Sequence, residues 1–207
     1  MKKSFYVPLG ILLFSLLLGF INKWNWQASQ KPLPQNGLES INTEAANQNN
    51  YKEFVTADKN FRINHPAAWF RLEDENILAA FNSKEWGEKY DLKTIFVAQN
   101  LQQGRFAQII VQEGVFDINI KEILQKMKDS NQKQQSEMEI IKSDIEGNKG
   151  VFEIRYLTPN APALYSKEMI LLGKEKTYLI AFIALENDWQ EFSEEANFLL
   201  GSAQIVQ

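Results

Sequence analysis

The segment Thr177–Leu185 constrains the fold more than any other part of the sequence, because it is apolar on both faces of a strand. With the alternation of a β-strand, Tyr178 and Ile180 lie on one face, and Leu179 and Ile183 lie on the other. Such a strand needs cover on both faces. The sequence therefore predicts a layered arrangement of sheet and helices, and it argues against a simple open sheet.

Several other segments have the length and pattern of strands. These predicted strands are, in chain order, residues 61–65, 77–81, 94–98, 107–111, 138–145, 151–157, 166–172 and 204–206. Residues 102–104, 146–149 and 173–176 have turn composition and join three strand pairs as hairpins. Short connections of this kind join antiparallel neighbours. We therefore expect a mainly antiparallel sheet of six or more strands.

Two amphipathic segments supply the helices that such a sheet needs. Asn119 can cap the first helix, with Glu122 three residues later as in a capping box. The polar residues 128–135 at its far end are expected to fray or to be solvated. Asp188 can cap the second helix, and Gly201 is expected to end it. The predicted fold class is α+β, an α/β/α sandwich with helices on both faces of the sheet.

Residues 1–26 are predicted to form an N-terminal transmembrane helix. Residues 5–21 are apolar and uncharged, and as a helix they span about 25 Å, just enough for the hydrocarbon layer. Trp24 and Trp26 follow where the far membrane interface is expected. A cleaved secretory signal is the alternative, but cleavage after Ala28 would put Trp26 where a small residue is required. An uncleaved anchor is therefore the favoured interpretation.

The charges around this anchor predict its orientation. Lys2 and Lys3 are expected to stay in the cytoplasm, so the rest of the chain crosses the cell inner membrane or a thylakoid membrane. Residues 27–50 are rich in amides and proline and are expected to be a flexible polar tether. Residues 51–207 have the size of one domain, which we expect on the extracytoplasmic side.

The composition removes several functional classes. The chain has no cysteine, which excludes thiol nucleophiles and thiolate metal sites, and one histidine, His65. Its net charge of −4 argues against a nucleic-acid partner. A hydrolase would need His65 beside a serine such as Ser83 or Ser166, but the sequence has no Gly-x-Ser-x-Gly motif. We expect a structural role for His65 and no enzymatic activity.

Three acidic groups could in principle hold calcium or manganese through oxygen ligands. They are residues 73–75, the group Glu85, Glu88 and Asp91, and the group Glu191, Glu194 and Glu195. None has the spaced Asp/Asn-Gly pattern of a calcium loop. We therefore expect solvated polar faces and no cofactor at these positions.

Two segments between strands are candidate partner contacts. Residues 82–93 carry Trp86 and Tyr90, which are either exposed on a loop for a partner or laid onto the sheet by a short helix. The sequence leaves both alternatives open. Residues 158–163, which include Asn160, are a second candidate contact loop, or only a wide connection.

The start and the C-terminal third of the predicted domain together resemble the PsbP family. Residues 61–69, Phe-Arg-Ile-Asn-His-Pro-Ala-Ala-Trp, are similar to the opening strand of that family and the turn that ends in tryptophan. The hairpin strand at residues 149–156, the strand at residues 178–182 and the helix from Asp188 to Ser202 follow the order of the family. The sequence departs from the family pattern at His65, where an aromatic residue is usual, and at Ala203, where phenylalanine is usual.

The resemblance implies a sheet sandwiched between helices and a non-enzymatic accessory role. Such a protein would dock on, assemble or stabilise a membrane protein complex from the extracytoplasmic side. In photosynthetic organisms this complex is photosystem II, whose manganese–calcium centre the family supports. The alternative function is a carrier or binder of a lipid or another small apolar ligand, which the aromatic content of 12% suggests.

Overall fold

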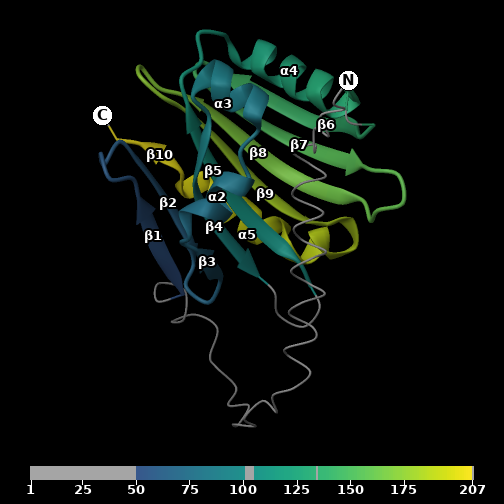
Figure 1. Ribbon diagram of the computed structural model, residues 1–207. Coiled ribbons are helices and arrows are strands. Elements are labelled where there is room, and N and C mark those ends of the chain that lie inside the picture. The colour runs from purple at the N-terminus through teal and green to yellow at the C-terminus, as the bar shows by residue number, and fades with distance from the viewer. Residues whose placement is uncertain (1–49, 101–104, 134, 207) are drawn as a thin grey trace, which may run out of the picture.

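The computed structural model describes residues 50–100, 105–133 and 135–206. These residues form, in chain order, β1 (Tyr51–Val55), β2 (Phe61–Pro66), β3 (Phe70–Leu72), α2 (Glu75–Ala80), α3 (Lys84–Tyr90), β4 (Lys93–Asn100), β5 (Ala107–Gly114), α4 (Ile120–Lys133), β6 (Glu137–Glu146), β7 (Lys149–Leu157), β8 (Leu164–Leu172), β9 (Thr177–Leu185), the 3₁₀ helix η2 (Glu186–Asp188), α5 (Trp189–Ser202) and β10 (Gln204–Ile205) (Figure 1).

Several predictions fall outside the described residues. They are the anchor at residues 1–26 with Trp24 and Trp26, the tether up to residue 49, and the turn at residues 102–104. Within the described part of the chain, every helix is too short or too polar to cross a membrane.

The strands form two antiparallel sheets. The larger sheet has seven strands in the order β3-β4-β5-β9-β8-β7-β6, and the smaller has three strands in the order β1-β2-β10. Every neighbouring pair in both sheets is antiparallel. This confirms the predicted α+β sandwich with a mainly antiparallel sheet of six or more strands.

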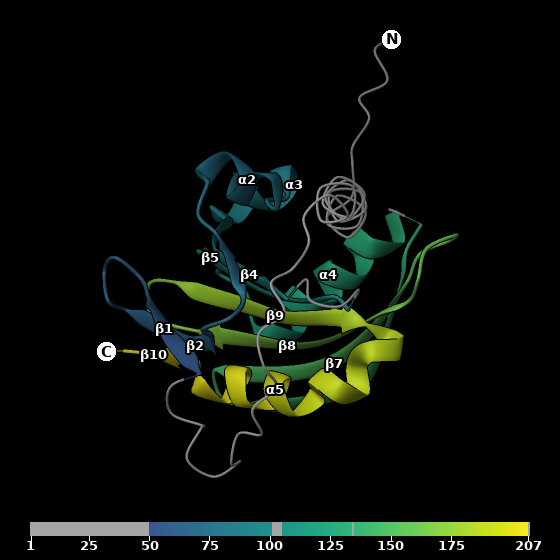
Figure 2. The same ribbon diagram turned by 90° about the horizontal axis from the view of Figure 1, so that it is seen from below.

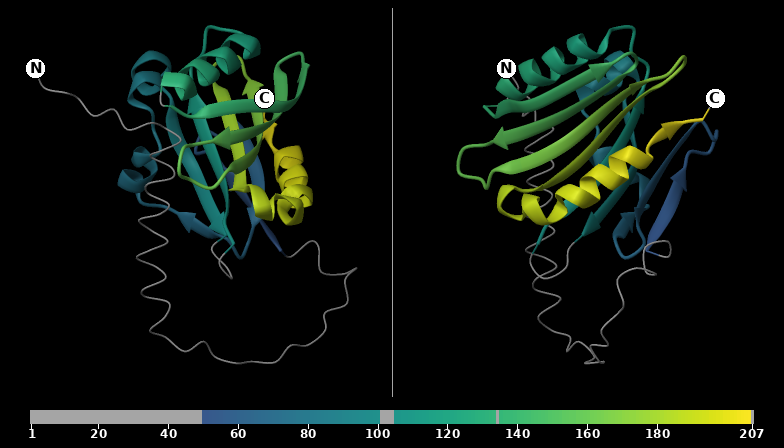
Figure 3. Two further views of the ribbon diagram at one scale, coloured as in Figure 1. Left: turned by 90° about the vertical axis from the view of Figure 1, so that its right-hand side faces the viewer. Right: turned by 180° about the vertical axis from the view of Figure 1, so that it is seen from behind.

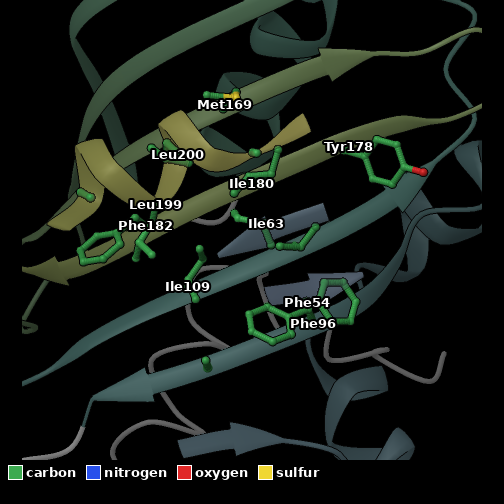
Figure 4. Packing of buried hydrophobic residues seen from close by; sticks show 14 of the residues in the cluster. Phe54, Ile63, Phe96, Ile109, Met169, Tyr178, Ile180, Phe182, Leu199 and Leu200 are labelled. Atoms are coloured by element: carbon green, nitrogen blue, oxygen red, sulfur yellow. The ribbon is translucent and has the colours of Figure 1, made fainter. Parts of the chain in front are cut away.

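Helices cover both faces of the seven-stranded sheet (Figures 2 and 3). Helix α5 and the small sheet pack on one face, while α2, α3 and α4 pack on the other. Strand β9 lies inside the sheet, and its Ile180 and Phe182 pack with Leu199 and Leu200 of α5 (Figure 4). Its Leu179 packs in a separate cluster with α3 and α4. The predicted cover on both faces of this strand is therefore confirmed.

The prediction of a strand at residues 77–81 was wrong, because residues 77–80 lie in helix α2 and Phe81 is its C-cap. Asp74 caps the helix, and its carboxylate accepts from the backbone N–H groups of Asn76 at 2.8 Å and Ile77 at 3.3 Å. A short apolar run has no period that separates strand from helix. Here the cap and the helix-forming residues Leu78, Ala79 and Ala80 decide the outcome.

Both predicted long helices exist, but their ends differ from expectation. The Asn119 side chain accepts from the N–H of Glu122 at 3.1 Å, which confirms Asn119 as the cap, while the Glu122 carboxylate accepts from the Asn119 side-chain amide and not from its backbone N–H as in a capping box. Helix α4 then continues to Lys133, so residues 128–133 are helical where fraying was one of the two predicted outcomes. At the start of α5 the Asp188 side chain makes no capping hydrogen bond, because this residue also ends the short helix η2.

Gly201 does not end helix α5, which runs on to Ser202. The Ser202 hydroxyl donates to the Leu199 carbonyl at 2.7 Å and accepts from the Asn64 N–H at 2.9 Å. The chain then leaves the helix in extended conformation and enters β10, which pairs with β2. A left-handed glycine stop would turn the chain away from this pairing, so the helix ends without one.

Candidate functional site

The face of the large sheet under α2, α3 and α4 contains a pocket of about 130 Å³. Strands β5, β9 and β8 supply its floor, and helices α3 and α4 with the β7–β8 connection supply its walls. The floor residues include Gln108, Ile110, Gln112, Leu179, Ala181, Ile183, Leu164 and Glu168, and the walls include Trp86, Met127, Asn131, Thr158 and Pro162.

The pocket is hollow because a small residue lies at the centre of its floor. Ala181 of β9 is in register with Ile110 of β5 on one side and with Glu168 of β8 on the other. Along β9 the neighbours on the same face are the larger Leu179 and Ile183. A methyl group among larger side chains leaves the free volume above the sheet.

Glu168 brings a buried carboxyl group to one side of this floor. Its Oε1 atom accepts from the Tyr156 hydroxyl at 2.7 Å and from the Ser166 hydroxyl at 2.9 Å. Burial raises the pKa of the Glu168 carboxyl, against the opposing effect of these two hydrogen bonds. Burial also raises the pKa of the Tyr156 phenol well above its ordinary value. Glu168 therefore keeps its proton to a higher pH than an exposed glutamate does.

This burial predicts a pH-dependent stability that Glu168→Gln removes. Because the pKa of Glu168 is higher in the folded than in the unfolded state, its contribution to stability is complete at acid pH and is lost as the pH rises through the folded pKa. Glutamine keeps an acceptor for the Tyr156 and Ser166 hydroxyls. Urea unfolding between pH 4 and 8 should therefore show wild type losing stability relative to Glu168→Gln as the pH rises. Parallel curves for the two proteins would contradict a buried, titrating carboxyl.

Two glutamines of β5 bring amide groups to the other side of the floor. The Gln112 Nε2 group donates to the Thr94 hydroxyl at 3.1 Å and to the Phe81 carbonyl at 3.3 Å. Gln108 is only 1% exposed, and its Nε2 group has no hydrogen-bond partner among the described residues. The pocket is therefore mostly apolar, with an unpaired donor on β5 and a buried carboxyl group on β8.

A second candidate site is the edge strand β6, beside α4 (Figures 1 and 3). In the described part of the chain no strand pairs with its outer edge, and nine of its ten residues are exposed. Ile140, Ile141 and Ile145 are exposed large apolar residues, and the pairing with β7 has a bulge between Ile140 and Lys142. The acids of this strand are Glu137, Glu139, Asp144 and Glu146, against one base, Lys142.

The segment with Trp86 and Tyr90 is a short helix, so the alternative of an exposed loop was wrong. Ser83 caps α3, and the Trp86 and Tyr90 side chains are buried. The ring of Phe116 lies 4.5 Å from that of Tyr90 and 5.9 Å from that of Trp86, centroid to centroid. Because these rings fill the space between helix and sheet, they present no exposed aromatic contact. Asn160 is exposed in the β7–β8 connection with φ of 62°, and its partner contact remains a prediction.

His65 is buried at the end of β2, on the face of the large sheet that α5 covers. Its Nδ1 atom lies 3.1 Å from the Pro66 carbonyl oxygen, and burial lowers the pKa of the imidazole. Ser83 and Ser166 both lie on the opposite face of the sheet, toward the pocket. The structure therefore does not bring His65 together with either serine, as a hydrolase would require.

Several members of the acidic groups singled out in the sequence are engaged with cations or a helix end. Glu73 pairs with Arg71, Glu85 with Lys133, Glu88 with Lys84 and Glu191 with Arg105, and Asp74 caps α2. Within the described ranges, histidines and acids form no group of three that could hold a metal ion. These groups therefore add nothing to the case for a calcium or manganese site.

Sequence reasoning missed the pocket, although two signals for it are present. Gln108 and Gln112 interrupt an otherwise apolar strand at positions that lie on the same face, and Ala181 is small among large neighbours. Each signal by itself is ordinary. Only the pairing of β5, β9 and β8 brings these residues to one place.

Comparison with known proteins supports the fold. No protein-family model and no curated protein matches this sequence. Among solved structures, cyanobacterial PsbP (CyanoP) from Synechocystis matches with a TM-score of 0.55 at 13% identity, covering 85% of this chain and 100% of that chain. The PsbP-like fold that the sequence resemblance implied is thus confirmed.

Two further solved structures are similar at lower scores. The Ran-binding protein Mog1p of Saccharomyces cerevisiae has a TM-score of 0.49 at 12% identity, covering 76% of this chain and 96% of that chain. LpqN of Mycobacterium tuberculosis, which is involved in cell envelope biogenesis, has a TM-score of 0.46 at 12% identity, covering 77% and 93%.

Proposed function

We propose that this protein is a membrane-anchored, non-enzymatic accessory module that docks on a membrane protein complex through the outer edge of β6. The open edge of this strand is the observation that carries the proposal. An edge strand presents backbone N–H and C=O groups that a further strand can pair with. Within the described residues this edge is uncovered, and three exposed isoleucines on the strand add apolar contact area.

The charge of β6 favours a partner strand with basic residues. Four acids and one lysine give the strand a clear negative excess, and Glu137, Asp144 and Glu146 are exposed. Opposite charges on facing strands stabilise a pair, and like charges destabilise it. The proposed partner is therefore an extended segment that alternates lysine or arginine with apolar residues.

The same charges disfavour a second copy of this chain as the partner. If β6 paired with itself in a centred antiparallel register, Glu137 would face Glu146 and Glu139 would face Asp144. All four facing positions would then repel. Edge strands commonly use charges in this way to prevent self-association.

The proposal places the module at the cell inner membrane or a thylakoid membrane. Residues 1–26 are its anchor, with the N-terminus in the cytoplasm, and residues 51–207 are the extracytoplasmic domain. A tether over residues 27–50 has a root-mean-square reach of roughly 25–30 Å, which lets the domain search for a partner close to the bilayer. The PsbP-like fold supports the accessory role, and in a photosynthetic source the partner complex would be photosystem II.

The alternative of a lipid carrier receives less support from the structure. Pockets for drug-sized ligands are typically about 300–1,000 Å³. The pocket under α4 is about 130 Å³, which is too small for a lipid. Any ligand of this pocket has to be much smaller.

Site-specific photo-crosslinking in native membranes tests the docking edge. A photoreactive residue at Ile145 of β6 should crosslink the full-length chain to a membrane-complex subunit, at a peptide that carries lysine or arginine. The same group at Phe198, exposed on α5, should not give this product. The variant Glu137→Lys, Glu146→Lys should reduce the product from position 145 at least tenfold, because it places like charges across the proposed interface.

A charge-matched variant controls for the change in net charge. Glu175→Lys, Glu194→Lys alters two exposed acids outside β6 and should leave the crosslink unchanged. Equal products from positions 145 and 198, or a crosslink from position 145 only to a second copy of this chain, would refute docking at β6. So would a product that tolerates the charge reversal on β6.

A further inference from the structure

The unpaired amide of Gln108 points to a ligand for the pocket. Strand alternation places Gln108, Ile110 and Gln112 on the pocket face of β5, whereas Ile109 and Val111 belong to the core under α5. Buried polar groups in folded proteins are almost always hydrogen-bonded. The neighbouring Gln112 follows this rule with two acceptors, and Gln108 does not. The Gln108 amide has no partner among the described residues, so it can donate a hydrogen bond to an acceptor atom of a ligand in the pocket.

The rest of the pocket defines the remainder of the ligand. Gln108 and Ser166 are both in register with Ile183, so they lie two strands apart, about 10 Å across the floor. Between and above them the surface is apolar, with Ala181 at the bottom and Met127 and Trp86 in the walls. An apolar cavity of about 150 Å³ is known to hold a molecule as large as benzene. A cavity of about 130 Å³ therefore suits a compact molecule of similar size.

The charge around the pocket excludes strong recognition of an anion. Among the described residues that line the pocket, Glu168 is the acidic group, and none is a lysine or an arginine. A ligand carboxylate or phosphate would therefore lose its hydration without gaining a cation. A neutral carbonyl or ether oxygen loses much less hydration free energy on burial, and the Gln108 amide can replace its lost hydrogen bond to water.

We propose that this pocket binds a small, neutral, mostly apolar molecule whose single acceptor oxygen receives a hydrogen bond from the Gln108 amide. This site lies on the sheet face under α3 and α4, and it does not depend on docking at β6. It would make the module responsive to a small aromatic ketone or a similarly compact ether.

Two probes of nearly equal shape test the site. Acetophenone carries a carbonyl oxygen, and cumene replaces this carbonyl by an apolar group. Methyl NMR of the full-length chain in detergent should show saturable shifts at Ala181 and Ile110 with acetophenone. The methyl group of Ala184, on the opposite face of β9, should not respond. Ala181→Leu fills the floor and should abolish binding of both probes.

The substitution Gln108→Met isolates the hydrogen bond, because it keeps the length of the side chain and removes the amide. The affinity for acetophenone should fall at least tenfold, and the affinity for cumene should stay unchanged or rise. Partitioning of the probes into detergent is the same for both proteins, so it cancels in this comparison. Absence of saturable acetophenone shifts in wild type would overturn the proposal. An equal change for both probes in Gln108→Met would also overturn it, and this comparison remains decisive if Ala181→Leu fails to fold.

Discussion

Replacement of Phe182 by alanine should lower the free energy of unfolding by about 3–5 kcal/mol, the range for aromatic deletions in protein cores. Phe182 is fully buried in the middle of β9. Its ring lies between the sheet and α5, with centroid distances of 5.7 Å to Trp69, 6.1 Å to Trp189 and 6.3 Å to Phe192 (Figure 4). Deletion leaves a cavity that the surrounding rings cannot fill without shifting both layers.

Chemical denaturation of the full-length protein in mild detergent measures this effect, with Phe198→Ala as the matched control. Phe198 lies on α5 but is 46% exposed, and its ring packs on Tyr51 at a centroid distance of 4.3 Å. Loss of one exposed aromatic pair should cost about 1 kcal/mol or less. If both variants were destabilised equally, Phe182 would not be the contact that joins the sheet to α5.

The variant Asp144→Lys, Glu146→Lys should raise the affinity of the protein for a second copy of itself through β6. In the centred antiparallel register, the new lysines face Glu139 and Glu137 of the other copy. The change reverses four facing charge pairs, each worth roughly 0.2–1 kcal/mol. A total gain of about 2 kcal/mol corresponds to an increase in dimer affinity of roughly 30-fold. Sedimentation of the full-length chain in detergent measures the change.

A second charge variant separates complementarity from a mere loss of negative charge. Glu137→Lys, Glu146→Lys changes the net charge by the same amount, but places lysine opposite lysine and leaves Glu139 opposite Asp144. This variant should show no gain in dimer affinity over wild type. If it dimerised as strongly as Asp144→Lys, Glu146→Lys, the outer edge of β6 would not be the surface that the charges protect.

Local chemistry predicted much of the fold. The hairpin of β6 and β7 follows from two strand-like segments around a short glycine-containing turn, and Gly147 has the positive φ of 56° that such a turn needs. The Asn119 cap on the N–H of Glu122 sets the start of α4. These features depend on residues a few positions apart, so the sequence displays them directly.

The predictions failed for segments whose conformation depends on neighbouring elements. The apolar residues 77–81 are compatible with a strand or with a helix. The Asp74 cap and the packing of α2 on the sheet select the helix. Gly201 has the composition of a helix stop, but the pairing of β10 with β2 sets the end of α5. Trp86 and Tyr90 are compatible with an exposed loop until helix α3 packs them against Phe116 and α4.

The sequence by itself determined that β9 lies inside a layered sandwich, because a strand that is apolar on both faces is stable only when both are covered. It also determined the charge pattern of β6. Only the tertiary structure decided that β6 is an edge, and that Gln108, Ala181 and Glu168 meet in one pocket. The physical reason is that strand order and register come from pairing between distant segments, which no local pattern encodes.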